Sequence, residues 1–158
     1  MVDISMAGAK IVLNASGIKS RPITEFSDEG TPIDIPALEV AAGSMNLNGK
    51  LVTWTKPNPV TVSFTLIPHS NSDKSLRSFL RAVHIGGKGE TVGDAFISSM
   101  IITVPSPKNE SSTRQKDKSE FTFTNGRLLS GQPAIGSNAE GKASPSTYTF
   151  MFESVSSN

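Results

Sequence analysis

The side chains that most often perform catalysis or bind metals are scarce in this sequence. The chain has two histidines, His69 and His84, and no cysteine. Disulfides and zinc sites built on thiolates are therefore excluded. The hydrophobic pattern predicts His69 at the end of a strand and His84 in the last turn of a helix, where a cation interacts favourably with the helix dipole. No metal-ligand spacing of carboxylates accompanies either histidine, so we expect no metal site.

Two glycine-rich segments resemble nucleotide-binding motifs but depart from them. Residues 136–142, Gly-Ser-Asn-Ala-Glu-Gly-Lys, are followed by Ala143, where a phosphate-binding loop needs a hydroxyl for Mg²⁺. Pro145 and a predicted strand then follow, where that motif needs a helix. The segment Gly87-Lys88-Gly89 lacks the third glycine of a dinucleotide-binding fingerprint, because Val92 occupies its place. Neither segment therefore predicts a nucleotide site.

The remaining candidates for chemistry are carboxylates and serines. Glu25, Asp28 and Glu29 cluster before Gly30 but lack the alternating spacing of a calcium-binding loop, so we interpret them as a solvated turn. No Gly-x-Ser-x-Gly segment is present to place a nucleophilic serine. Because every enzyme template fails, we expect a protein that is not an enzyme and uses no cofactor.

Composition and charge restrict the function further. The chain of 158 residues fits one domain, 1–158, and its charged share of 18% is low. The net charge of +1 gives no basic excess of the kind that nucleic-acid-binding proteins carry. The first ten residues lack the apolar segment of a secretory signal, and no stretch approaches the ~18 apolar residues of a membrane span. We therefore expect a protein made and kept in aqueous cytosol.

Alternating apolar and polar residues predict a chain built mainly of strands. The clearest strand is 60–67, which we expect to form a hairpin with 51–55 around the proline-containing turn 56–59. The segment 95–104 is apolar enough to be buried on both faces or to meet a neighbouring subunit. Further strands are expected at 10–15, 22–26, 33–40, 121–129 and 147–155.

One segment predicts a helix over about residues 72–85, capped at its start by Asn71 or Ser72. Its apolar stripe, at helical spacing, consists of Leu76, Phe79, Leu80 and Val83. The predicted fold class is mainly β, a β-sandwich or small barrel with this single helix packed on one side. We expect a flexible N-terminal arm at 1–9 and mobile loops at 105–119 and 131–145.

The segment from Asn48 to Val83 resembles the tail tube proteins of bacteriophages, above all those with contractile tails, which share a fold with Hcp-like tubes. The residues that carry the resemblance are the two strands 51–55 and 60–66, followed by Ser70-Asn71-Ser72-Asp73-Lys74 and the helix. The strand pair at 95–130 and the aromatic strand that ends at Phe152 are also similar. The resemblance covers about 100 residues.

The resemblance implies a structural subunit of a tail tube. Six copies would form a ring, and stacked rings would conduct the double-stranded genome into the host. Partners would be the protein itself, the sheath protein and the baseplate or tail terminator, with no stable membrane insertion. The protein would be assembled in the host cytoplasm and reside in the virion tail. Alternatives are a baseplate tube-initiator ring, the tube of a related contractile injection or secretion machine and, more distantly, a carbohydrate-binding β-sandwich module.

Two groups of residues are candidates for roles in such a tube. Thr61, Ser63 and Thr65 form an uncharged hydroxyl row opposite the apolar face of their strand, which predicts that they line the lumen. A loop of alternating charges is predicted to contact the adjacent ring. Its candidate residues are Lys108, Glu110, Arg114, Lys116, Asp117 and Lys118.

Overall fold

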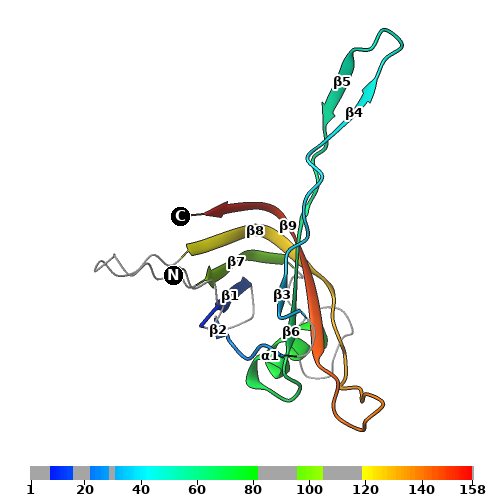
Figure 1. Cartoon of the computed structure of the whole chain (residues 1–158). Coiled ribbons are helices and arrows are strands. Elements are labelled where there is room, and N and C mark those ends of the chain that lie inside the picture. The colour runs from blue at the N-terminus through cyan, green and yellow to red at the C-terminus, as the bar shows by residue number, and fades with distance from the viewer. Residues whose placement is uncertain (1–7, 16–21, 29–30, 82–95, 105–118, 158) are drawn as a thin grey trace, which may run out of the picture.

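The structure is a computed structural model that describes residues 8–15, 22–28, 31–81, 96–104 and 119–157 (Figure 1). The predicted fold class is confirmed, because the described chain is mainly strand with one helix. The strands are β1 Lys10–Ala15, β2 Pro22–Ile23, β3 Ile33–Asp34, β4 Ala41–Met45, β5 Leu51–Thr55, β6 Val60–Leu66, β7 Phe96–Val104, β8 Ser119–Ser130 and β9 Ser146–Ser157. The helix α1 spans Asn71–Leu80. Among the described residues, no helix is long and apolar enough to cross a membrane.

Seven strands form one antiparallel sheet in the order β2-β1-β7-β8-β9-β6-β3. The sheet curls, and α1 packs against its concave side (Figure 1). β4 and β5 form a separate two-stranded sheet that projects from the body. The chain therefore has a packed body and one extended hairpin.

The core follows from the period of two in the strands. On β6, Val62, Phe64 and Leu66 are fully buried, so the face predicted to be the core is the core. The aromatic row of β9 lies beside it, and the rings of Phe64 and Phe150 stack with centroids 5.4 Å apart. Burying such large rings removes roughly 150–250 Å² each from water, which makes this row the main source of apolar stabilisation.

The helix begins one residue earlier than expected. Ser70 has an extended backbone and is the N-cap, and its side chain accepts a hydrogen bond from the backbone N–H of Asp73. The predicted caps Asn71 and Ser72 are instead the first helical residues. The helix ends at Leu80, and the remaining predicted residues, 82–85, lie outside the described part of the chain.

The predicted hairpin of 51–55 with 60–67 is wrong. β5 pairs with β4, from Leu51 opposite Met45 to Thr55 opposite Ala41, while β6 pairs with β9 and β3. The prolines at 57 and 59 do not form a tight turn. They lie in the stretch that joins the projecting hairpin to the body. The predicted strands 22–26 and 33–40 are likewise reduced to β2 and β3.

A corner in the sheet lies where β8 and β9 bend. Asn125 on β8 has a positive φ of 53°, and Gly126 packs against the ring of Phe152 on β9. Beyond Phe152, the residues of β9 no longer pair with β6, because β6 begins at Val60 opposite Phe152. β9 then continues along β8 alone, while the chain on the other side runs out into β4 and β5 (Figure 1).

Candidate assembly interface

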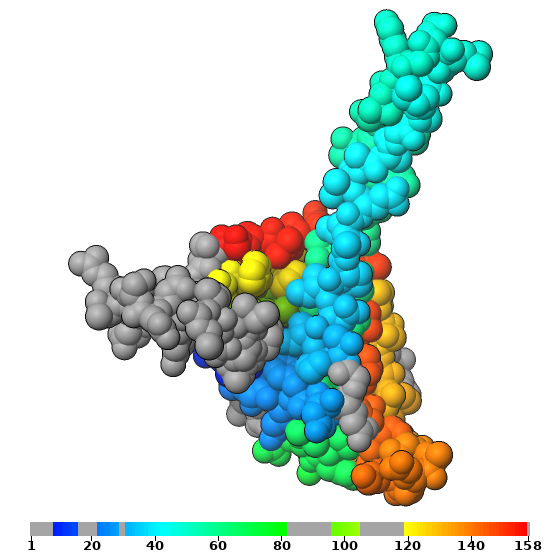
Figure 2. Space-filling model, viewed as in Figure 1, coloured from blue at the N-terminus to red at the C-terminus, as the bar shows by residue number. Residues whose placement is uncertain are grey.

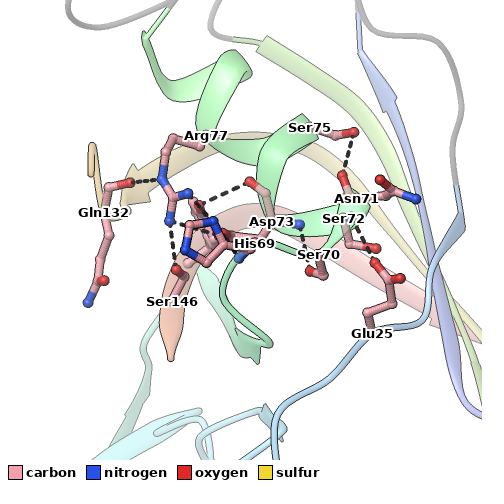
Figure 3. Close-up of polar contacts among 11 residues, drawn as sticks. Glu25, His69, Ser70, Asn71, Ser72, Asp73, Ser75, Arg77, Gln132 and Ser146 are labelled. Carbon is pink, nitrogen blue, oxygen red and sulfur yellow. Dashed lines mark hydrogen bonds and ion pairs between the residues drawn. The ribbon is translucent and has the colours of Figure 1, made fainter. Parts of the chain in front are cut away.

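A buried polar cluster fastens α1 to β9 (Figure 3). Asp73, in the first turn of the helix, is fully buried and pairs with Arg77, whose Nη1 lies 2.8 Å from Asp73 Oδ2. Arg77 Nη2 also donates to Ser146 Oγ on β9 at 2.8 Å, and its Nε donates to the backbone oxygen of Gln132 at 3.3 Å. Both charges are therefore paired and hydrogen-bonded to a strand that is far away in sequence.

Tyr148 completes this cluster from the core side. Its hydroxyl donates to Asp73 Oδ1 at 2.9 Å. Burial raises the pKa of Tyr148 well above its ordinary value, and the hydrogen bond and charge of Asp73 raise it further. Such a phenol stays protonated and acts as a fixed donor. The arrangement thus holds structure together and presents no group poised to react with a ligand.

One residue of the acidic cluster, Glu25, contributes to the same helix. Glu25 Oε2 accepts a hydrogen bond from the backbone N–H of Ser72 at 3.0 Å, so Glu25 satisfies one free donor at the helix start. The interpretation of Glu25 as a purely solvated turn residue is therefore wrong, although Asp28 is exposed as expected. His69 has a positive φ of 66°, and its backbone N–H donates to Asp73 Oδ2. His84 and Glu29 lie outside the described residues.

The segment 136–142, which resembles a phosphate-binding loop in sequence, forms a tight β-turn. Asn138 accepts at its backbone oxygen from the N–H of Gly141, and its Oδ1 accepts from the N–H groups of Glu140 and Lys142. Gly141 has a φ of 79°, and no helix follows: β9 begins at Ser146. The similarity is therefore explained by turn chemistry, in which glycine supplies the left-handed residue.

The same turn is present at the tip of the projecting hairpin. Asn46 Oδ1 accepts from the N–H groups of Asn48 and Lys50, and its backbone oxygen accepts from Gly49, which has a φ of 76°. The two turns share the pattern Asn-x-x-Gly-Lys, at 46–50 and 138–142. The sequence held this signal, which identifies 46–50 as the connection between β4 and β5.

The surface of the hairpin formed by residues 41–55, here called the arm, is unusually apolar. Thirteen large hydrophobic side chains are exposed among the described residues, and eight of them lie between 35 and 54, which concentrates exposed apolar surface on the arm and its base. Trp54 is half exposed, and Leu47 at the tip is fully exposed. Figure 2 shows the arm standing clear of the body. Apolar surface gathered in this way marks an interaction site.

The predicted hydroxyl row of β6 continues onto the neighbouring strand β9, and its side chains are only partly exposed. Ser63 Oγ lies 3.0 Å from Thr149 Oγ1, and Thr65 Oγ1 lies 3.2 Å from Thr147 Oγ1, so these two hydroxyls pair across β6 and β9. Thr65 is buried, with 8% of its surface exposed, while Thr61 and Ser63 are half-buried. Lining of a lumen by this row stays a prediction.

The other predicted site falls outside the described residues. The six charged residues of the predicted inter-ring loop lie within 105–118, and so does all of the predicted loop 105–119 except Ser119. Residues 1–7 of the predicted N-terminal segment 1–9 also lie outside the described residues. Their role stays a prediction. Among the residues that the structure describes, no group of three or more His, Asp or Glu side chains could hold a metal ion.

Comparison with known proteins identifies the class of this protein. The family model described as "Tail fiber protein gp32" matches residues 2–156. Because the match covers nearly the whole chain, the chain belongs to this family, and it is a tail-related structural protein. No curated protein sequence matches it.

Two solved structures resemble the fold over its full length. One is the tube-terminating cap of the anti-feeding prophage, with a TM-score of 0.55, 12% identity, and 100% of this chain and 92% of that chain covered. The other is the sheath/tube terminator of the extracellular contractile injection system PVC, in its extended state. It has a TM-score of 0.52, 11% identity, and 99% and 96% coverage. At these identities the likeness shows the fold.

Proposed function

We propose that this protein is a ring-forming structural subunit that closes the end of the tail tube in a contractile phage tail or a related injection machine. The observation that supports the proposal is the likeness to two tube-terminating proteins, because the structural match covers nearly the whole of this chain and nearly the whole of each of theirs. The apolar arm supports it as well, because a subunit that works in an assembly needs exposed surface for its neighbours.

In this role the copies form a hexameric ring that contacts the tube and the sheath. The genome would pass through the ring during ejection, and the protein would be assembled in the host cytoplasm and carried in the virion tail. We further propose that the protein is not an enzyme, since its buried polar cluster is built for structure and its described residues offer no metal site.

The second candidate is a subunit of the tube itself, in stacked hexameric rings. The uncharged row that includes Thr61 and Ser63 favours this candidate, because small hydroxyls neither bind nor strongly repel phosphate. An initiator ring at the baseplate would use the same surfaces, and the family description names a tail fibre.

Localisation separates these roles. Virions or injection particles are labelled with antibody against this chain and viewed by electron microscopy. We expect label at the end of the tube that lies opposite the baseplate. Label along the whole tube would support the second candidate, whereas label on fibres or at the baseplate would refute the terminator role. Electron microscopy of the purified protein should show six-fold rings, and a persistent monomer would contradict ring formation.

A further inference from the structure

The sheet of the body ends in an open strand edge. On one side, residues 153–157 of β9 pair with β8, from Glu153 near Asn125 to Ser157 opposite Phe121. On the other side no described strand pairs with them, because β6 reaches only to Phe152. All five residues are exposed. An edge of this kind presents unpaired backbone donors and acceptors to any strand that reaches it.

The arm carries open edges as well. β4 and β5 pair with each other, and neither pairs with another strand in the described chain. Both are five residues long, equal to the open edge of β9. An isolated two-stranded hairpin is marginally stable in water, so the arm gains more from added pairing than a strand inside a large sheet would.

The two surfaces carry few of the features that usually prevent edge pairing. Soluble proteins protect open edges with charged residues, above all lysine, and with proline. β4 and β5 contain no charge and no proline. The edge 153–157 has one charge, Glu153, and its Val155 is 44% exposed. Val155 is thus the one apolar side chain that the edge offers to the apolar side chains of the arm.

The arm points away from the edge of its own chain. Its base is braced by Lys56 and Glu39, whose charged atoms lie 3.0 Å apart, and by Asn58, which donates to the backbone oxygen of Glu39. From there the arm continues the direction of β6, while residues 153–157 turn off along β8 at the corner (Figure 1). The arm and the edge of one copy therefore diverge and do not pair with each other, whereas a second copy offers each surface the other one.

We propose that the arm of one copy adds its strands to the edge 153–157 of the next copy. The contact is heterologous, because it joins two different surfaces. Each copy offers one arm and one edge, so the contact repeats around a ring until the ring closes. The inference rests on the proposed function, which is that of a ring-forming subunit, and it names the two surfaces that join neighbouring copies in the ring.

The absence of cysteine from the chain makes cross-linking a direct test. One single-cysteine variant carries Thr53→Cys on the arm, and a second carries Ser156→Cys on the edge; both native side chains are exposed. We expect a short bismaleimide to join the two variants when they are mixed, and a variant with both cysteines to give a ladder of oligomers. The control is Ser137→Cys, an exposed site in the turn region before β9. If Thr53→Cys reacts with Ser137→Cys as well as with Ser156→Cys, or not with Ser156→Cys at all, the proposal is overturned.

Proline substitution tests the backbone pairing itself. Neighbouring residues of a strand donate to opposite sides, so one of Ser154 and Val155 donates toward β8 and the other toward the open edge. Proline at the outward donor should leave folding intact and abolish cross-linking. Proline at the inward donor should lower the melting temperature. Two variants that both fold and both cross-link like the parent would refute the inference.

Trp54, the chain's only tryptophan, gives an independent readout. Its fluorescence should shift to shorter wavelength as protein concentration rises, and the outward-donor proline variant should lose this shift.

The experiments distinguish failure of the pairing from failure of the proposed function. Cross-linking of Thr53→Cys to Ser156→Cys in a protein that never reaches a tail would refute the function alone. Tail incorporation without that cross-link would refute the pairing alone.

Discussion

Replacing Arg77 by alanine should destabilise this protein far more than removing a charge from its surface. In the parent, the Arg77 guanidinium neutralises Asp73 and donates to Ser146 and to the backbone oxygen of Gln132. Without it, a carboxylate with no solvent exposure loses its counter-charge. Removing one partner of a buried pair costs roughly 3–5 kcal/mol.

The surroundings of Asp73 place the expected cost at the lower end of that range. The hydroxyl of Tyr148 and the backbone N–H of His69 still donate to the carboxylate, and the helix N-terminus still favours a negative charge. We therefore expect a loss of about 3 kcal/mol from the free energy of unfolding. With a urea m-value of roughly 1–3 kcal/mol/M, the unfolding midpoint falls by roughly 1–3 M.

Urea unfolding followed by circular dichroism measures this cost, and the chain provides a matched control. The pair of Lys56 and Glu39 has a similar distance, 3.0 Å, but its side chains are 41% and 61% exposed. Lys56→Ala should cost less than about 1 kcal/mol. The double variant Asp73→Asn, Arg77→Met removes both charges and should be more stable than Arg77→Ala. If Arg77→Ala costs no more than Lys56→Ala, the cluster does not fasten the helix as argued.

Three further predictions follow from the same structure. The free energy of unfolding should fall as pH rises above about 10, because the unfolded state loses the phenolic proton there while the folded state holds the proton of Tyr148 more tightly. Urea titrations at several pH values should show less of this loss for Tyr148→Phe. Gly126→Ala should lower the free energy of unfolding by roughly 1–3 kcal/mol, because a Cβ there would lie 2.6 Å from the backbone oxygen of Met151. Gly136→Ala, which has open space around it, should leave the melting temperature unchanged. The double variant Thr61→Lys, Ser63→Lys should slow genome ejection at low salt and recover at high salt; unchanged ejection from normal tails would place the row elsewhere.

Local patterns in the sequence predicted the longer strands well, because period-two alternation is a property of a single strand, whereas β2 and β3 are shorter than predicted and β4 was not predicted. The strand 60–67 and the aromatic strand that ends the chain were both found in this way, with their buried faces. Partners of strands were harder to predict. The choice of β9 over β5 as the partner of β6 depends on the match between the apolar row of β6 and the aromatic row of β9, which lie more than eighty residues apart where Phe64 pairs with Tyr148. No local signal encodes that match.

The candidate site shows the same difference between local signals, which can be seen in the sequence, and contacts between distant residues, which cannot. Exposed apolar residues on 41–55 are visible in the sequence, but a half-buried strand has the same composition, so only the missing partner sheet reveals the arm. The contact of Arg77 with Ser146 joins residues of ordinary types at large separation. The turn pattern at 46–50 and 138–142 is the exception, because its hydrogen bonds are local and its glycine is required by the backbone.

If the proposed pairing holds, the strand β9 serves folding in its first half and assembly in its second. Its first half, through Phe152, is buried against β6, and Tyr148 within it holds the helix cluster. Its second half, from Glu153, is exposed and keeps β8 as its one described neighbour. The division falls where Gly126 of β8 lies opposite Phe152, next to Asn125 with its positive φ, and Phe152 is also the last residue of β9 that pairs with β6. A change before the corner should therefore alter the stability of the single chain, whereas a change at the outward backbone after it should leave the fold intact and alter only association between copies.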